Sequence, residues 1–221
     1  MIKQHLDELL RMHHKEGERF QRQLGEFVKQ HTPGIIVETG SGISTIFMLK
    51  AMDETGIGRL FSVDPSPVGG YVIEHPRYKI VHKKSFQALA SLYQETGPWN
   101  LFLHDSDHWV ECMTYELDMA YACAAEGGWI MADDHTWDGH DAWKRFVARN
   151  VLGSTEFSLG SVQAVQKQWG APAIQSASEL LSSRLWDSAK EHGSAWRTAN
   201  GRKPCWTCGD EYVESGTNRN A

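Results

Sequence analysis

The chain has 221 residues, a length typical of one domain with short extensions. Hydrophobic residues make up 41 % of the chain and charged residues 23 %, which is ordinary for a soluble globular protein. The formal net charge of -6 argues against a nucleic-acid-binding protein, because domains of that kind are usually basic. The longest basic stretch, Arg77–Lys84, is interpreted as a solvated loop and strand edge.

The sequence shows neither a secretory signal nor a membrane span. Residues Met1–Arg19 mix charged and apolar side chains and lack the apolar core of a signal peptide. No apolar run approaches the roughly 20 residues that a membrane span needs. We therefore expect a cytoplasmic protein without a membrane partner. Cys112 and Cys123 are expected to be small core residues.

Apolar residues in the first part of the chain recur at helical spacing, from Ile2 to Met12 and again from Phe20 to Phe27. This pattern predicts one or two amphipathic helices that end before Thr32. We interpret them as cover for the edge of a sheet; the alternative is a lid over an active site. The expected organisation is a helical extension at residues 1–31, a main domain at 32–169, and a peripheral helix with a weakly ordered tail at 170–221.

From Gly34 onward, short apolar runs alternate with segments of helical length. Continuous apolar runs suit strands buried on both faces of a parallel sheet, and strand–helix alternation predicts a doubly wound α/β fold. Gly127-Gly128 is interpreted as the stop before the fifth strand, and β-prone pieces around Gly160 predict an antiparallel hairpin. The expected strands contain residues 35–37, 60–63, 79–81, 101–103 and 129–131; the expected helices cover Ser44–Glu54, Ser85–Gln94, Trp109–Ala125 and Gly139–Val151.

The first predicted strand runs into the segment Glu38-Thr39-Gly40-Ser41-Gly42-Ile43-Ser44, and a helix follows. Glycines at a strand-to-helix turn let the backbone approach a ligand closely, and the helix N-terminus offers free N–H groups. Taken alone, this motif fits either a cofactor site or a tight loop. The second strand ends at Asp64, where doubly wound folds place an acid that binds ribose hydroxyls. The alternative is a turn aspartate before Pro65.

Acidic residues follow the fourth and fifth predicted strands, in His104-Asp105-Ser106-Asp107-His108 and in Asp133-Asp134-His135. Because the carboxyl ends of such strands line one crevice, Asp105, Asp133 and Asp134 should converge. Carboxylates this close repel each other unless a cation lies between them, and Mg²⁺ prefers oxygen ligands. We therefore favour a divalent-metal site over the alternative, in which the acids cap the following helices.

Taken together, these motifs resemble the class I S-adenosylmethionine-dependent methyltransferases, over about residues 32–167. The most similar subgroup is the metal-dependent O-methyltransferases of the macrolide-sugar and catechol types. The resemblance implies a Rossmann-like, mostly parallel, seven-stranded sheet with an antiparallel C-terminal hairpin strand. Two departures stand out: Ser44 occupies the place of a further glycine in many members, and the insertion with which catechol-type enzymes hold an aromatic substrate is not evident.

The resemblance implies roles for individual residues in binding S-adenosylmethionine. Glu38 would bind its amino acid end, the backbone of Gly40 and Gly42 would line it, Asp64 would bind the ribose, and Ser85 would lie near the adenine. The full set expected to bind the cofactor is Glu38, Thr39, Gly40, Ser41, Gly42, Ser44, Asp64 and Ser85.

The resemblance also implies a metal and a base. Mg²⁺ would be held by Asp105, Asp133 and Asp134, and His108 would be the general base; the alternative for His108 is a core or helix-capping role. The implied reaction is metal-assisted methylation of a hydroxyl on a small-molecule acceptor. His135 has no firm counterpart in the family.

Two other functions stay open from the sequence alone. A nucleotide-cofactor oxidoreductase of the same fold would carry a full G-x-G-x-x-G motif, which is absent here. A non-catalytic ligand-binding protein of this fold is the other alternative. The acceptor and the oligomeric state, including a homo-oligomer, are also open. Cys205 and Cys208 are interpreted as an isolated pair rather than a zinc site, Trp143 as core and Trp137 as a pocket wall.

Overall fold

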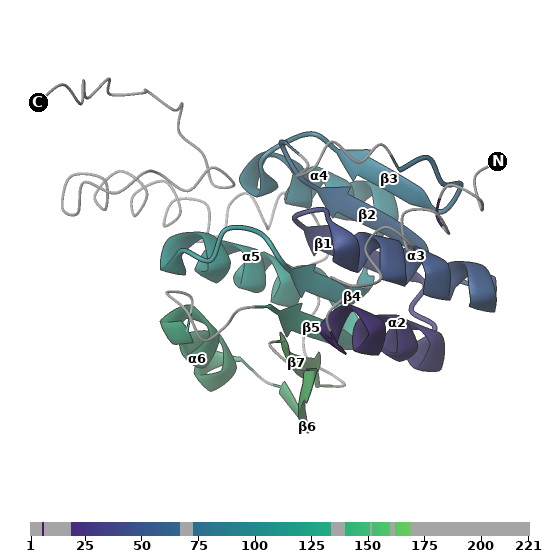
Figure 1. Ribbon diagram of the computed structural model, residues 1–221. Coiled ribbons are helices and arrows are strands. Elements are labelled where there is room, and N and C mark those ends of the chain that lie inside the picture. Colours follow the sequence, from purple (N-terminus) through teal and green to yellow (C-terminus); the bar gives the residue numbers. More distant parts are fainter. Residues whose placement is uncertain are drawn as a thin grey trace, which may run out of the picture.

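The computed structural model describes Leu6 and residues 19–66, 73–133, 140–150, 152–159 and 162–168. These residues form one sheet with the strand order β3-β2-β1-β4-β5-β7-β6 (Figure 1). All neighbouring strands are parallel except β7, which is antiparallel to both β5 and β6. The strands are β1 (Ile35–Thr39), β2 (Arg59–Val63), β3 (Tyr78–Val81), β4 (Trp99–His104), β5 (Ala124–Ala132), β6 (Leu152–Leu159) and β7 (Val162–Lys167).

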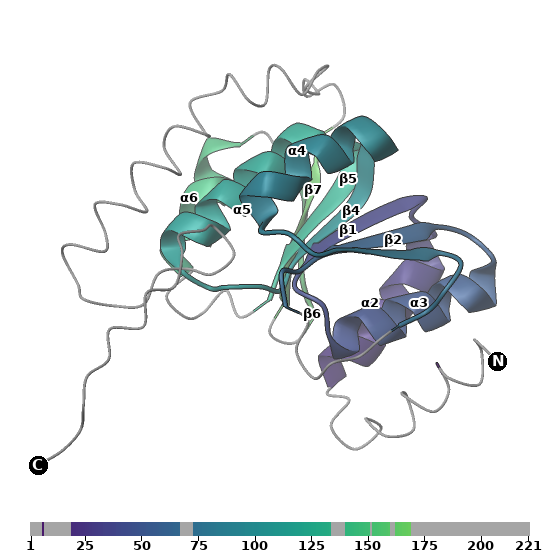
Figure 2. The same ribbon diagram turned by 90° about the horizontal axis from the view of Figure 1, so that it is seen from above.

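Helices cover both faces of the sheet. In Figure 2, α4, α5 and α6 lie on one side, and α2 and α3 lie on the other. The helices are α2 (Arg19–His31), α3 (Ile43–Thr55), α4 (Ser85–Thr96), α5 (Val110–Cys123) and α6 (His140–Arg149). The predicted Rossmann-like α/β fold, with its C-terminal antiparallel hairpin, is confirmed.

Each central strand contributes apolar side chains to both faces. In β1, Ile36 packs in the cluster that α2 and α3 cover, whereas Val37 packs in the cluster that α4, α5 and α6 cover. The same alternation separates Leu60 from Phe61 in β2. Two-sided burial is the reason why the strands read as continuous apolar runs in the sequence.

The α2 helix has a different place from the predicted one. It lies against a face of the sheet beside α3, where the ring of Phe27 meets that of Trp129 in β5 edge-on at 5.3 Å. A Cβ at Gly25 would lie 3.3 Å from the carbonyl oxygen of Phe47, so the glycine allows α2 and α3 to pack closely. The sequence pattern correctly predicts the helix and its end before Thr32. It does not predict that the helix covers a face of the sheet.

The connection from α5 to β5 corrects a second prediction. The helix ends at Cys123, and β5 starts at the next residue, so Gly127 and Gly128 lie inside the strand and are not the helix stop. Gly127 has φ +68°, and the pairing with β4 shifts register near this point. The carbonyl groups at the end of α5 are satisfied instead by Lys167 of β7, whose Nζ donates to Tyr121 at 2.9 Å and to Ala124 at 3.0 Å. A buried ammonium group thus takes the place of the expected glycine cap.

Several predictions concern other core residues. Cys112, Cys123 and Trp143 are buried, as expected. The turn at Gly160, the peripheral helix near Ser178–His192, the Cys205–Cys208 pair and Trp137 lie outside the described residues. Within the described part of the chain, no helix has the length and apolar character that crossing a bilayer requires.

The position of Gly128 generates a prediction about stability. A Cβ there would lie 2.8 Å from the carbonyl oxygen of Trp99 and 2.9 Å from that of Ala125, and both contacts are with backbone. Gly128→Ala should therefore lower the free energy of unfolding by about 2 kcal/mol or more, as overpacking does. Urea denaturation measures this difference. As a control, Gly42→Ala should change it by less than about 0.5 kcal/mol, and equal effects of the two substitutions would contradict the packing at Gly128.

Candidate functional site

Four parallel strands end side by side at one edge of the sheet, and residues singled out from the sequence lie just beyond them. The backbone N–H of Gly40 donates to β2 at 3.0 Å, that of Asp64 to β3 at 3.1 Å, and that of Asp105 to β1 at 3.0 Å. The N–H of Asp133 donates to β4 at 2.9 Å. The sheet pairing therefore continues one residue past the strands and brings these four positions into one row.

Gly40 lies where the turn after β1 passes over the end of β4. Its φ is +86°, and a Cβ at this position would lie 2.0 Å from the carbonyl oxygen of Asp105. Both the backbone conformation and the available space therefore require glycine. At Gly42, which caps the N-terminus of α3, a Cβ would meet no atom of the described residues within 4 Å. The turn is tight at Gly40 and open at Gly42.

Glu38 is fully buried on the α3 side of β1. Its Oε1 accepts a hydrogen bond from the Thr45 hydroxyl at 2.6 Å and another from the Ser62 hydroxyl. Its Oε2 has no hydrogen-bond partner among the described residues. Burial raises the pKa of Glu38 to about 8, although the two hydroxyls oppose the shift. This carboxyl group therefore has one oxygen available to a polar or cationic ligand.

Asp64 follows β2 and is also buried. Its Oδ1 accepts a hydrogen bond from the backbone N–H of Ser66 at 2.8 Å. Burial raises the pKa of Asp64, while the backbone N–H groups of Ser66 and Ser41 oppose that shift. The Ser41 hydroxyl lies 3.2 Å from that of Tyr78 in β3. The first turn is thus linked to the carboxyl end of β2 and to the first residue of β3.

The predicted metal ligands are only partly described. His104 pairs with Ala132 between β4 and β5, so Asp105 and Asp133 follow neighbouring positions of adjacent strands. The Ser44 hydroxyl donates to Oδ2 of Asp105 at 3.0 Å. Asp134 and His135 lie outside the described residues. Within the described part, no three His, Cys, Asp or Glu side chains form a group that could hold a metal ion.

Glu116 of α5 is a site residue that the sequence analysis missed. It is fully buried, and its Oε2 accepts hydrogen bonds from the Thr39 hydroxyl at 2.5 Å, from His104 Nδ1 at 2.7 Å and from the Ser106 hydroxyl at 2.9 Å. Burial alone would raise the pKa of Glu116, but the bonds from His104, Thr39 and Ser85 outweigh it and hold the pKa below its ordinary value. Glu116 is therefore a buried carboxylate ion.

These contacts involve two residues that the sequence analysis singled out. Thr39 and Ser85, which the sequence analysis assigns to the cofactor site, are both buried, and their hydroxyl groups stabilise Glu116. Their contact with the cofactor stays a prediction. The sequence signal for Glu116 was its position in a helix stripe that is otherwise apolar, four residues after Cys112 and four before Ala120. A charged residue in such a stripe requires partners, and its partners here are at the strand ends.

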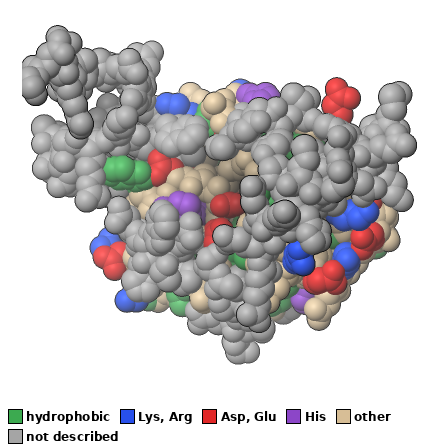
Figure 3. Space-filling view, in the orientation of Figure 1, with side chains coloured by type: hydrophobic (Ala, Val, Ile, Leu, Met, Phe, Trp, Pro, Cys, Tyr) green, Lys and Arg blue, Asp and Glu red, His purple; other side chains and the backbone are tan. Residues whose placement is uncertain are grey.

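His108, the predicted base, is half-buried in the loop before α5. Its ring lies 5.5 Å from the ring of His104, with an angle of 79° between the planes. His104 itself is fully buried and bonded to Glu116. Figure 3 shows acidic side chains beside a histidine in a hollow near the middle of the face in view.

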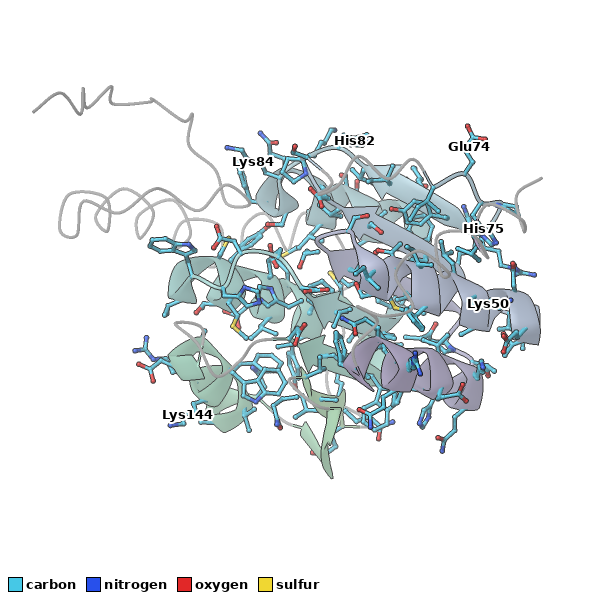
Figure 4. All side chains as sticks on the ribbon, viewed as in Figure 1. Lys50, Glu74, His75, His82, Lys84 and Lys144 are labelled. Carbon is cyan, nitrogen blue, oxygen red and sulfur yellow. The ribbon has the colours of Figure 1, made fainter. Side chains whose placement is uncertain are left out.

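The other polar clusters lie at the margins of the sheet. His82 and Lys84 follow the carboxyl end of β3, next to the start of α4, whereas Glu74 and His75 precede its amino end (Figure 4). His75 is buried and bonds Asp53 of α3 at 2.9 Å, which ties the helix to the β3 side of the sheet. The basic stretch is a solvated strand edge, as predicted.

Comparisons with known proteins agree with this geometry. The family model of a methyltransferase domain matches residues 37–135, which extend from β1 to just beyond β5. No curated protein matches the chain.

Solved structures share the fold at low sequence identity. The O-methyltransferase from Bacillus cereus, in complex with SAH, is 17 % identical with a TM-score of 0.56, over 74 % of this chain and 91 % of that one. A putative O-methyltransferase from Klebsiella pneumoniae is 19 % identical with a TM-score of 0.58, over 74 % and 90 %. The MycE methyltransferase from the mycinamycin biosynthetic pathway, in complex with Mg and SAH, is 14 % identical with a TM-score of 0.55, over 76 % and 54 %.

The matched region contains the carboxyl end of β1 and all of β2, β4 and β5, the four strands whose ends build the candidate site. The glycine turn at Gly40 belongs to the same region. Residues 37–135 therefore match a methyltransferase domain, and the sheet has the fold of solved O-methyltransferases.

Proposed function

We propose that this enzyme transfers the methyl group of S-adenosylmethionine to a hydroxyl group of a small-molecule acceptor, with a divalent cation at the strand ends. The observation that carries the proposal is the combination of an open turn at Gly42 and a buried carboxyl oxygen of Glu38 that has no partner among the described residues. Solved structures of the same fold hold SAH, and one of them also holds Mg, which supports both parts of the proposal.

The residues at the ends of β1 and β2 fit the cofactor. The backbone at Gly42 can approach a ligand without a side chain in the way. Oε2 of Glu38 is available to the amino group of the cofactor, which is a hydrogen-bond donor that a buried carboxylate favours. Asp64 has a second oxygen with which to accept bonds from ribose hydroxyls.

The residues at the ends of β4 and β5 fit the cation. Asp105 and Asp133 supply hard oxygen ligands from adjacent strands, and Asp134 adds the third in this proposal. The Ser44 hydroxyl donates to Oδ2 of Asp105 and so helps to orient that carboxylate. His108 lies in the loop that starts with Asp105, three residues away, so the proposed base and a proposed ligand are on one short segment.

The reaction then requires positioning and one proton transfer. When bound, the cofactor supplies a methyl group on a positively charged sulfur, and the cation supplies charge that lowers the pKa of the acceptor hydroxyl. The acceptor oxygen would form its bond to the methyl carbon as the sulfur–carbon bond breaks, and His108 would take the hydroxyl proton. Alignment of two reactants can lower a reaction barrier by about 7–11 kcal/mol. In this proposal, the residues at the strand ends provide that alignment.

The open turn generates a prediction about cofactor binding. Gly42→Ala adds a methyl group to space that the cofactor would occupy, and it should weaken SAH binding at least tenfold, which corresponds to about 1.4 kcal/mol. Isothermal titration calorimetry measures the affinity, and urea denaturation should show an unchanged fold. Equal SAH affinity in the variant and the wild type would mean that the cofactor does not use this turn.

The buried carboxyl group generates a prediction about pH. In the folded state, Glu38 keeps a proton up to about pH 8, whereas in the unfolded chain it loses that proton near its ordinary pKa of 4.5. Stability should therefore fall as pH rises between those values, by up to about 1.4 kcal/mol per pH unit from this group.

Glu38→Gln separates this effect from all other titrations. The amide oxygen can still accept from Thr45 and Ser62, but the side chain no longer ionises, so this slope should vanish from urea-denaturation data at pH 5 to 8. SAH binding should weaken at least tenfold, because the amide carries no charge for the amino group. The same pH slope in both proteins would contradict the assignment.

The metal site is tested by direct binding. Asp133→Asn and Asp134→Ala should each weaken Mg²⁺ binding more than tenfold, since each removes a charged ligand, while SAH binding stays close to that of the wild type. Calorimetric titration with Mg²⁺ in the presence of SAH gives both values. Asp141→Asn, an exposed acid at the start of α6, is the matched control. Unaltered Mg²⁺ affinity in both site variants would remove the cation from the proposal.

A further inference from the structure

Glu116 takes no part in the chemistry proposed above, yet it is the buried acid with the most hydrogen-bond donors among those described. Three donors converge on its Oε2, at 2.5 Å, 2.7 Å and 2.9 Å. A carboxylate without solvent is costly to bury unless hydrogen bonds compensate, and here they compensate through one oxygen, because Oε1 has no hydrogen-bond partner among the described residues. The arrangement therefore needs an explanation beyond packing of α5.

The three donors belong to different parts of the site. Thr39 is the last residue of β1, directly before the turn at Gly40. His104 is the last residue of β4, and it pairs in register with Thr39, so both side chains reach the same face of the sheet. Ser106 is in the loop that carries Asp105, Asp107 and His108. One carboxylate oxygen on α5 thus joins the end of the cofactor strand, the end of the acidic strand, and the loop itself.

The strength of this link depends on the charge of Glu116. The hydrogen bonds hold the carboxyl group ionised despite its burial. Bonds to an ionised acceptor are about twice as strong as neutral ones, and their strength increases in a low-dielectric interior. The backbone bond from Asp105 to β1 fixes the start of the loop, but the Ser106 contact is the side-chain bond described that holds the next residue to α5.

We propose that Glu116 is a positioning residue, which fixes the loop of residues 105–108 against the end of β1 and so sets the geometry of the acidic half of the site relative to the cofactor half. The expected effect on ligand binding rests on the proposed function. The expected effect on the loop itself does not depend on any ligand. Ser106 transmits the effect to the loop, and His104 transmits it to the ring of His108, which it meets edge-on.

The test uses the full chain and three single variants. Ser106→Ala removes one donor from a half-buried position and leaves the fold intact, whereas Glu116→Gln removes the charge and keeps an acceptor oxygen. Ser91→Ala is the control, because it removes the same hydroxyl group from an exposed residue of α4 whose bond is local, to the carbonyl of Ala88 at 2.9 Å. Urea denaturation of each protein identifies any global loss of stability.

Hydrogen exchange of the backbone amides of residues 105–108, without ligand, is the first readout. We expect Ser106→Ala and Glu116→Gln to speed this exchange about tenfold, with no such change in Ser91→Ala. Binding is the second readout: Mg²⁺ affinity in the presence of SAH should fall about tenfold in the first two variants, while SAH affinity without Mg²⁺ stays within about twofold.

The outcomes separate the inference from the proposed function. Unchanged loop exchange in Ser106→Ala and Glu116→Gln would overturn the positioning role, whatever the ligands do. A similar rise in Ser91→Ala, or in every amide of the protein at once, would overturn it too, because the effect would then be global destabilisation. Failure of the wild type to bind SAH would instead overturn the proposed function, and the exchange data would still decide the role of Glu116.

Discussion

The site depends on one close approach of backbone, where the turn after β1 passes over the end of β4. A single carbonyl oxygen, that of Asp105, fills the space in which a side chain at position 40 would stand. This contact fixes the distance between the two halves of the site, since one half follows β1 and β2 and the other follows β4 and β5. Any side chain at position 40 would have to push the two halves apart.

On either side of β1 the protein buries a carboxyl group, and the two groups are held in different states. Glu38, on the α3 side, receives hydroxyl bonds on one oxygen, and burial keeps it protonated to about pH 8. Glu116, on the α5 side, receives bonds from two hydroxyls and an imidazole on one oxygen and remains ionised. The number and kind of donors therefore decide the charge of each acid. We propose that the neutral Glu38 binds a cationic group of the ligand, and that the ionised Glu116 fixes the strand ends and the loop relative to each other.

Much of the fold could be predicted from local patterns. Strands buried on both faces appear in the sequence as continuous apolar runs, and the residues after them lie in one row because parallel strands end together. The predictions that were wrong have a common cause: the residues that make the deciding contacts are remote in sequence. The cap of α5 is Lys167, more than forty residues away, so Gly127 appeared to be the only available stop.

The same cause explains the missed site residues. The hydroxyl groups of Thr39 and Ser85 bond Glu116 in α5, a helix whose position relative to β1 no local pattern reveals. Glu116 is a charged residue in an otherwise apolar stripe, which the sequence shows. The residues that bond Glu116 could not be identified from the sequence. The acidic row after β4 and β5 was easier to find because the residues adjoin the strands that position them.

The most direct test of the central claim is calorimetric titration of the full chain with SAH at pH 7, in buffers that differ in ionisation enthalpy, with NAD as the comparison ligand. We expect saturable SAH binding with net release of a proton, because the ligand's amino group would favour ionised Glu38. NAD should not bind measurably. Absence of SAH binding, or tighter binding of NAD, would contradict the account.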